Sequence, residues 1–294
     1  MAAITQETVT ANGVDFTVLC AVTGGDNAPL ALCLHGFPDS AHSWRHLLPE
    51  LARAGYRAVA PFQRGYAPTS IPADGLFQSG VLAADANALH EVLGGDERAV
   101  IIGHDWGASA AHAASVLEPE RWCKVVSMAV PPGPALAMAL LTSPAQLKLS
   151  WYMFFFQSPL ADLVVPANDL AFSDMLWAEW SPGFDATDEL AHVKAALGNS
   201  ANLAAALGYY RATLGDGPKD PALDPAQAAT QAVPEQPMLY LHGRNDGCIG
   251  VAVAEVAAAM APAHVTCRVV DGAGHFLHVE RPKLINAFIM DFLS

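Results

Sequence analysis

The chain has few charged residues, and cations are the scarcer sign. Charged side chains make up 15% of its 294 residues, with 15 Lys and Arg against 29 Asp and Glu and a formal net charge of −14. This shortage of cations excludes an extended basic surface, so neither nucleic acid nor an anionic membrane is an expected partner. Because 52% of the residues are hydrophobic, we expect a large buried core and no disordered chain.

Cysteine pairs and long apolar runs are also missing. The five cysteines are scattered without a Cys-x-x-Cys pair, so they predict neither a metal site nor a redox motif. Pro, Lys or Gln interrupts the most apolar stretches before they reach the length of a membrane span. The first residues lack the basic start and apolar core of a signal peptide, and we therefore expect a cytoplasmic protein.

What the sequence does contain is an alternation of strand-like and helix-like segments. Apolar runs typical of strands covered on both faces occur at residues 30–34, 57–60, 99–102, 124–129, 238–241 and 266–270. Amphipathic helices are predicted at residues 43–54, 79–93, 109–117, 251–260 and 282–293. The alternation predicts an α/β fold with a mostly parallel, doubly wound sheet.

One long segment breaks this alternation. From about residue 131 to residue 233 the chain is rich in Ala, Leu and aromatic residues, and proline-rich turns bound it on both sides. We predict that residues 1–132 and 234–294 form the α/β core and that residues 133–233 form an inserted helical lid. Such a lid would cover a site at the carboxyl edge of the sheet.

The pentapeptide GHDWG at residues 103–107 follows the apolar run 99–102 directly. A strand that enters a tight turn, with glycines two residues either side of a reactive side chain, is typical of a nucleophile elbow. The central Asp105 in place of serine predicts attack by a carboxylate on an electrophilic sp³ carbon. Taken alone, an aspartate at a strand end is also a common turn or helix-cap residue.

A base and an orienting acid are expected after the later strands. His275 ends the glycine-rich turn GAGH between the last strand and the last helix, which favours it as the base. Asp246 follows the strand at 238–241 and is the candidate acid, although a turn role is the alternative. The other acid position, after strand 124–129, has no carboxylate up to Leu149. His278 leaves an exchange of histidines open, but we expect it to pack within its helix or lie at the surface.

The turn HGFP at residues 35–38 follows the strand 30–34. In a hydrolase with a nucleophile elbow, the oxyanion hole takes one backbone N–H from this loop and one from the residue after the nucleophile. The predicted donors are therefore the N–H groups of Phe37 and Trp106. The alternative is that Gly-Phe-Pro forms only a tight turn, with a cis bond before Pro38.

Taken together, HGFPDS at residues 35–40, RGY at 64–66, GHDWG and the Asp246/His275 pair resemble the epoxide hydrolases of the α/β-hydrolase fold. The resemblance covers nearly the whole chain from about residue 30. Gln63 stands where that family often has an aspartate. Haloalkane dehalogenases share these core motifs, so the lid has to separate the two reactions.

The resemblance implies two lid tyrosines that donate hydrogen bonds to the epoxide oxygen. A Tyr-x-x-x-aromatic-Gln pattern at residues 152–157 and an aromatic-Tyr-Arg pattern at 209–211 make these Tyr152 and Tyr210. Either tyrosine alone would more often be a packing residue. The implied reaction converts a small apolar epoxide and water to a vicinal diol through an ester on Asp105. It needs no metal or other cofactor. The substrate-binding residues that we expect are Phe37, Trp106, Trp151, Phe155 and Phe156.

Two other functions stay open at the level of sequence. A haloalkane dehalogenase would need a second N–H donor for the halide besides Trp106, and Phe37 occupies the usual asparagine position. The lid tryptophans Trp151, Trp177 and Trp180 could supply that donor. The other alternative is a non-catalytic ligand-binding protein that keeps the fold. A homodimer is one expected assembly.

Overall fold

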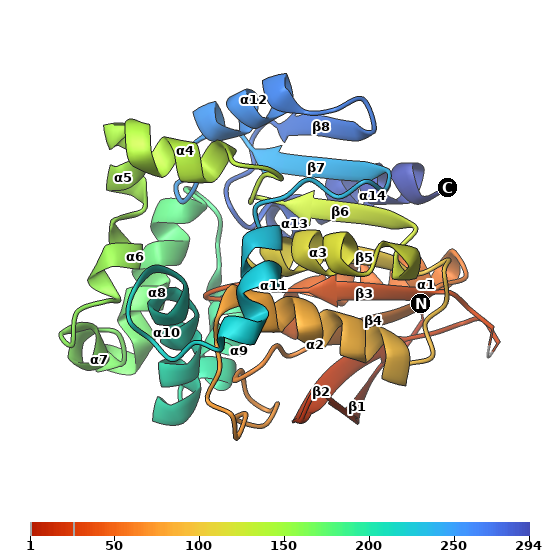
Figure 1. Cartoon of the computed structure of the whole chain (residues 1–294), viewed down its shortest axis with the longest axis horizontal. Helices are drawn as coiled ribbons and strands as arrows, with labels where there is room; N and C mark the ends of the chain where they lie inside the picture. The colour runs from red at the N-terminus through yellow and green to blue at the C-terminus, as the bar shows by residue number, and fades with distance from the viewer. Residues whose placement is uncertain (1, 26) are drawn as a thin grey trace.

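A computed structural model describes residues 2–25 and 27–294 of the chain (Figure 1). Eight strands form one sheet in the order β1-β2-β4-β3-β5-β6-β7-β8. β2 runs antiparallel to β1 and β4, and every other neighbouring pair is parallel. The predicted α/β fold with a mostly parallel sheet is therefore confirmed.

All six predicted strands are present. They are β3 (Leu30–Leu34), β4 (Arg57–Pro61), β5 (Val100–His104), β6 (Lys124–Met128), β7 (Met238–Gly243) and β8 (Val265–Val270). Every residue of β3, β5 and β7 is buried, as the continuous apolar runs predicted. β8 lies at the edge of the sheet, and its burial is interrupted.

The N-terminal hairpin was not among the predicted strands. β1 (Ile4–Ala11) pairs with β2 (Val14–Ala21) through a two-residue turn at Asn12 and Gly13, both with positive φ. An Asn-Gly turn between two alternating segments is a strong hairpin signal. The sequence therefore contained the information for this pair, since only Asn and Gly adopt that turn at low cost.

Helices pack on both faces of the sheet. In Figure 1, α2 (Ser79–Val92) and α3 (Trp106–Leu117) lie on the near face, with α1 (Leu48–Arg53) and α14 (Pro282–Leu293) behind the sheet. The remaining core helices are η1 (Ala41–His46), η2 (Pro119–Arg121), α12 (Val251–Met260) and α13 (Leu277–Glu280). The single helix predicted at 43–54 is split into η1 and α1. Pro49 lies in the first turn of α1, where its missing N–H costs no hydrogen bond.

Between β6 and β7 the described chain forms helices and contains no strand. These are α4 (Ala135–Thr142), α5 (Pro144–Leu149), α6 (Trp151–Phe155), α7 (Ala161–Val164), α8 (Ala167–Trp180), α9 (Thr187–Leu197), α10 (Ser200–Leu214), η3 (Pro221–Leu223) and α11 (Asp224–Ala229). Figure 1 shows α5 to α10 beyond the carboxyl ends of the parallel strands. α11 instead packs on α2 and α3, so the end of this segment covers the core.

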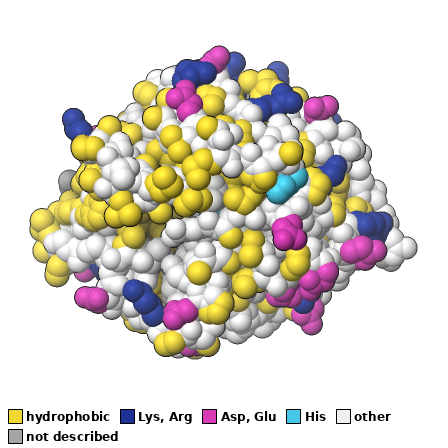
Figure 2. Space-filling model, turned by 45° about the horizontal axis from the view of Figure 1, so that its top comes forward, with side chains coloured by type: hydrophobic (Ala, Val, Ile, Leu, Met, Phe, Trp, Pro, Cys, Tyr) yellow, Lys and Arg dark blue, Asp and Glu magenta, His cyan; other side chains and the backbone are white. Residues whose placement is uncertain are grey.

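The surface over the first lid helices is unusually apolar. Figure 2 shows hydrophobic side chains gathered at the left of the view, on the side where Figure 1 has α4 to α7. Exposed apolar residues of this region include Met138, Leu141, Phe154, Leu160 and Leu163. In the described residues, no helix combines the length and apolar character that crossing a membrane requires.

Candidate active site

Asp105 lies in the sharp turn between β5 and α3. Its φ of 53° is in the left-handed region that a non-glycine residue rarely adopts, so the surrounding structure must hold it there. A Cβ atom on Gly103 would overlap the carbonyl of Gly107, and a Cβ atom on Gly107 would overlap the carbonyl of Leu34. Both glycines are therefore required for the turn to pack, as the elbow motif predicted.

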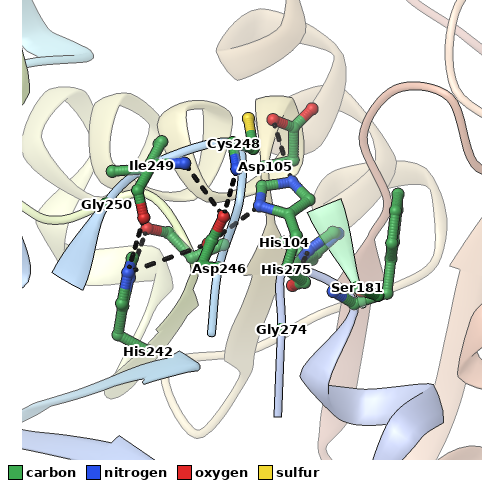
Figure 3. A network of polar contacts seen from close by, with 12 residues as sticks. His104, Asp105, Ser181, His242, Asp246, Cys248, Ile249, Gly250, Gly274 and His275 are labelled. Carbon is green, nitrogen blue, oxygen red and sulfur yellow. Dashed lines mark hydrogen bonds and ion pairs between the residues drawn. The ribbon is translucent and has the colours of Figure 1, made fainter. Parts of the chain in front are cut away.

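The structure brings the predicted nucleophile, base and acid together. Nε2 of His275 lies 3.6 Å from Oδ2 of Asp105, and Nδ1 of His275 lies 3.0 Å from Oδ2 of Asp246 (Figure 3). The three side chains come from the loops that follow β5, β8 and β7, and all three are buried. An imidazole held between two carboxylates is the arrangement that a base and its orienting acid require.

Asp246 is fixed by its own loop. Its Oδ1 accepts the backbone N–H groups of Cys248 at 2.7 Å and Ile249 at 2.9 Å, which leaves Oδ2 for His275. Burial by itself would raise the pKa of Asp246, but the charge and hydrogen bond of His275 outweigh it and the pKa is lowered. The residue therefore stays ionised, and its turn role and its orienting role coexist.

The charges of the two aspartates raise the pKa of His275. Burial disfavours the imidazolium form, but Asp246 above all, with Asp105, more than compensates and raises the pKa of His275 well above its usual range. Burial likewise opposes ionisation of Asp105, whereas the hydrogen bond and charge of His275 lower the pKa of Asp105. The resting site therefore contains a carboxylate nucleophile beside a protonated imidazole.

The loop after β3 supplies one backbone donor to the nucleophile. The N–H of Phe37 donates to Oδ1 of Asp105 at 2.8 Å, and the Phe37–Pro38 bond is cis. A Cβ atom on Gly36 would overlap the carboxyl group of Asp105, so this close approach needs glycine. The second predicted donor, Trp106, is the first residue of α3. Its N–H therefore has no carbonyl partner within that helix.

Tyr152 on α6 and Tyr210 on α10 reach the same cavity as Asp105. This cavity of about 60 Å³ is lined by Asp105, Trp106, Ser109, Val130, Leu136, Ser150, Tyr152, Met153, Tyr210 and Ile249. The two tyrosine rings lie 5.7 Å apart, and both side chains are buried. Burial raises the pKa of each phenol well above its usual range, so both stay protonated hydrogen-bond donors.

The two phenols differ in what their hydroxyl groups contact. The hydroxyl of Tyr152 lies 3.2 Å from Sγ of Cys248. The buried hydroxyl of Tyr210 has no hydrogen-bond partner among the described residues, although its ring packs against those of Trp106 and Phe37. A thiol is a weak acceptor, so both phenols remain available to a ligand in the cavity.

Two of the predicted substrate-binding residues do not line the cavity. Trp151 is 38% exposed and borders a separate surface hollow with Lys148 and Glu179, so the structure places it outside this cavity. Phe155 stacks on Phe172 and is also outside the cavity lining. Residues 151 and 155 share one face of α6, whereas residues 152 and 156 share the adjacent face that is turned to the site.

The other aromatic predictions lie at or next to the cavity. Trp106 lines it directly. Phe37 and Phe156 form a buried layer behind it, with their rings 5.5 Å apart and each packed against Tyr210. The sequence analysis missed Val130, Leu136, Met153 and Ile249 in the lining, as well as Cys248 beside Tyr152. The one signal in the sequence concerned Cys248 and Ile249, which lie two and three residues after the predicted acid Asp246.

The alternatives raised by the sequence can be compared with this geometry. His275 lies between the carboxylates, whereas the buried His278 faces Asp39 at 4.0 Å, so the histidines are not exchanged. Nε1 of Trp177 donates to the carbonyl of Pro38 at 2.8 Å and is not free to bind a halide. The lid rings that pack against Trp106 belong to Tyr209 and Tyr210, not to a tryptophan.

The fold and site together define a class of protein. The alpha/beta hydrolase fold family model matches residues 29–282, and the chain belongs to that family.

Within that family its relatives include epoxide hydrolases. The chain is 32% identical to epoxide hydrolase A of Mycobacterium tuberculosis, over 100% of this chain and 98% of that protein. It is 29% identical to human epoxide hydrolase 4, over 96% of this chain and 76% of that protein. Among solved structures, the crystal structure of epoxide hydrolase A from Mycobacterium thermoresistibile matches with a TM-score of 0.77 and 28% sequence identity. The match spans 99% of this chain and 98% of that one.

Proposed function

We propose that the chain is an epoxide hydrolase that converts a small apolar epoxide to a vicinal diol through an ester on Asp105. The observation that carries the proposal is that two buried, protonated phenols share one small cavity with a carboxylate nucleophile. Opening an epoxide leaves an alkoxide, which departs readily only when hydrogen-bond donors stabilise its developing charge. Tyr152 and Tyr210 are donors of that kind.

In the first step, an Asp105 oxygen attacks one epoxide carbon and the carbon–oxygen bond of the ring breaks. The new C–O bond is the ester, and the alkoxide takes a proton from a tyrosine hydroxyl. The tyrosine is reprotonated after the ring has opened: in the parent protein the imidazolium of His275 gives up its proton, and where His275 is replaced the proton comes from solvent. No charge is left over, because the step removes one carboxylate charge and one imidazolium charge together.

In the second step, His275 activates water. Esterification neutralises Asp105, so one of the two carboxylates that stabilise the imidazolium is lost and only Asp246 remains. The neutral His275 removes a proton from water, whose oxygen attacks the ester carbonyl. The N–H groups of Phe37 and Trp106 stabilise the resulting oxyanion. Collapse releases the diol and restores the Asp105 carboxylate beside a protonated His275.

The cavity lining supports an apolar substrate. Four of its side chains are aliphatic or thioether groups: Val130, Leu136, Met153 and Ile249. A cavity of about 60 Å³ favours a compact substrate. All the groups that the reaction uses are side chains or backbone N–H groups of the chain, so the scheme requires no cofactor.

A single turnover in ¹⁸O-labelled water tests the nucleophile. With enzyme in excess, the first diol should contain no label, and the label should appear in Asp105 by peptide mass spectrometry. Label in that first diol would mean direct attack by water and would overturn the ester scheme. Release of halide from haloalkanes, without diol from epoxides, would instead favour the dehalogenase.

The variant His275→Gln tests the second step. It should form the ester without hydrolysing it, so the intact protein should gain the mass of one epoxide. His264→Gln is a suitable control, because His264 bonds to the carbonyl of Pro234, which is not a lining residue of the cavity. An unmodified His275→Gln protein that is folded and still binds substrate would contradict the two-step mechanism.

A further inference from the structure

A second cluster of potential metal ligands lies next to the triad, and the proposed mechanism does not use it. Asp39, His104 and His278 are all buried, and each offers one ligand atom within 4.8 Å of the other two. Oδ2 of Asp39 lies 3.8 Å from Nδ1 of His104 and 4.0 Å from Nε2 of His278. The three residues come from the loop after β3, the end of β5 and α13.

Several polar atoms in this cluster lack partners. Nδ1 of His104 and both ring nitrogens of His278 are buried, and none has a hydrogen-bond partner among the described residues. Buried polar groups without partners are costly and rare in native proteins. Nδ1 of His104 and Nε2 of His278 both lie near the Asp39 carboxylate, so one species bound between them would give each of these two nitrogens a partner.

Hydrogen bonds from the surroundings orient two of these side chains, His104 and Asp39, for binding a cation. Nε2 of His104 hydrogen-bonds the carbonyl of His275 at 3.0 Å, which requires the ring proton on Nε2 and leaves a lone pair on Nδ1 toward Asp39. The carboxylate of Asp39 accepts the N–H of Ser40 at 2.7 Å and the hydroxyl of Ser43 at 3.0 Å. Metal-binding histidines and carboxylates are usually oriented by such outer hydrogen bonds.

We propose that Asp39, His104 and His278 bind one divalent transition-metal ion, with Zn²⁺ as the best fit. Two imidazoles and one carboxylate are ligands that suit zinc. The two histidine nitrogens lie 3.8 and 4.0 Å from Oδ2 of Asp39 and within 4.8 Å of each other. Zinc–ligand distances are about 2.0–2.2 Å, so the three side chains must shift inward by a few tenths of an ångström to complete the site. A water would take the fourth position.

The ion would have a positioning role. Asp39 lies two residues after Phe37, His104 directly precedes Asp105, and His278 lies three residues after His275. One ion would therefore join the segments that present an oxyanion donor, the nucleophile and the base. We expect it to stabilise the active-site loops without contacting the substrate.

The experiment has to distinguish this site from a second group of potential metal ligands. Asp246, Cys248 and His275 also offer atoms within 4.8 Å of one another. The measurements should therefore use Cys248→Ser protein, expressed without a polyhistidine tag and made metal-free with a chelator. Cobalt provides a spectroscopic test, because a site of nitrogen and oxygen ligands gives visible Co²⁺ bands without the charge-transfer absorption of a thiolate.

The variants to compare are His278→Gln, Asp39→Asn and, as a matched control, His112→Gln. His112 is another buried histidine with an unpartnered ring nitrogen, but it bonds to Ser127 away from the cluster. Equilibrium dialysis with Zn²⁺ alone should give about one ion per chain for the parent and the control, with a rise in Tm. Affinity should fall at least about 10-fold in the two cluster variants.

Three results would overturn the proposal. The first is a parent protein that retains no zinc and shows no zinc-dependent change in Tm. The second is cluster variants that bind as tightly as the control, and the third is Co²⁺ bound without its visible tetrahedral bands. If either cluster variant fails to fold, the titration and Co²⁺ spectrum of the parent still decide the question.

Discussion

The two halves of the active site differ in how firmly their polar groups are held. On the core side, Asp246 orients His275 at 3.0 Å, and the N–H of Phe37 binds Asp105 at 2.8 Å. On the lid side, the hydroxyl of Tyr152 bonds only to a thiol, and the hydroxyl of Tyr210 has no hydrogen-bond partner, among the residues that the structure describes. The polar groups of the core half are thus positioned before substrate binds, whereas the hydroxyl groups of the lid half remain free to donate hydrogen bonds to the substrate.

The two halves are nevertheless joined by a few hydrogen bonds. The carbonyl of Trp180, at the end of α8, accepts the N–H of His275 at 2.9 Å and that of Gly247 at 3.2 Å. Glu280 links the lid to the base loop, because its carboxylate accepts the hydroxyl of Ser181 at 2.6 Å and the N–H of Gly274 at 2.7 Å. Hydrogen bonds therefore hold the end of α8 to the base loop, whereas the hydroxyl groups of the two lid phenols have no comparable bonds to the core.

The largest effect is expected from breaking the core half. In Asp246→Asn the base loses both its orientation and the charge that favours its protonated form. We expect hydrolysis of the ester to slow by about 10⁴-fold, the size of the corresponding change in a serine-protease triad. Formation of the ester should persist, so the alkylated protein should accumulate and be visible by mass spectrometry.

The control for this variant is Asp271→Asn, which removes an exposed carboxylate paired with Arg244 on the protein surface. It should hydrolyse the ester at the parent rate. If Asp246→Asn folded normally but slowed formation and hydrolysis of the ester equally, the result would contradict a role of Asp246 through His275 in hydrolysis alone.

Removing the lid donors should have the next largest effect. Tyr210→Phe and Tyr152→Phe should each slow ester formation by about 10²–10³-fold, the usual loss when one donor to a developing oxyanion is removed. Pre-steady-state quenching of tryptophan fluorescence measures this step, because Trp106 lines the cavity. Hydrolysis of the ester, once formed, should be much less affected.

Tyr209→Phe is the matched control for the lid variants. Its hydroxyl is also buried but donates to the carbonyl of Arg64 at 2.7 Å, tying α10 to the core. We expect a loss of about 1 kcal/mol in the free energy of unfolding. Ester formation should be unchanged, and a loss equal to that of Tyr210→Phe would mean that the phenols act only through packing.

The same contrast explains what the sequence could predict. Asp105, Asp246 and His275 follow parallel strands, whose carboxyl ends must meet at one edge of the sheet, so strand order alone brings them together. The lid has no such constraint. Which face of α6 turns inward depends on packing between helices. The sequence therefore could not show that Tyr152 would line the cavity while its neighbour Trp151 would lie outside it.

A pH profile should separate the two steps. The pKa of Asp105 is lowered and those of Tyr152 and Tyr210 are raised well above 10, so nucleophile and donors keep their active forms between about pH 5 and 10. Ester formation should therefore vary little across this range. Hydrolysis needs neutral His275, so it should fall with decreasing pH by up to about tenfold per unit below the pKa of His275 in the ester. Rapid-quench measurement of both rates checks this, and a steep acid limb in ester formation would contradict the assignment.

The smallest effect should come from the one contact that restrains a lid phenol. Cys248→Ser replaces a weak sulfur acceptor beside Tyr152 by a stronger oxygen acceptor, so the hydroxyl should be held away from the substrate more firmly. We expect ester formation to slow by about fivefold, equivalent to about 1 kcal/mol. Cys248→Ala removes the acceptor and should leave the rate equal to or slightly above that of the parent. Both substitutions remove the sulfur, and serine differs from alanine only by the Oγ that can accept the hydrogen bond, so a difference between the two variants reports on that oxygen. Equal rates in the two variants would mean that the thiol does not restrain Tyr152.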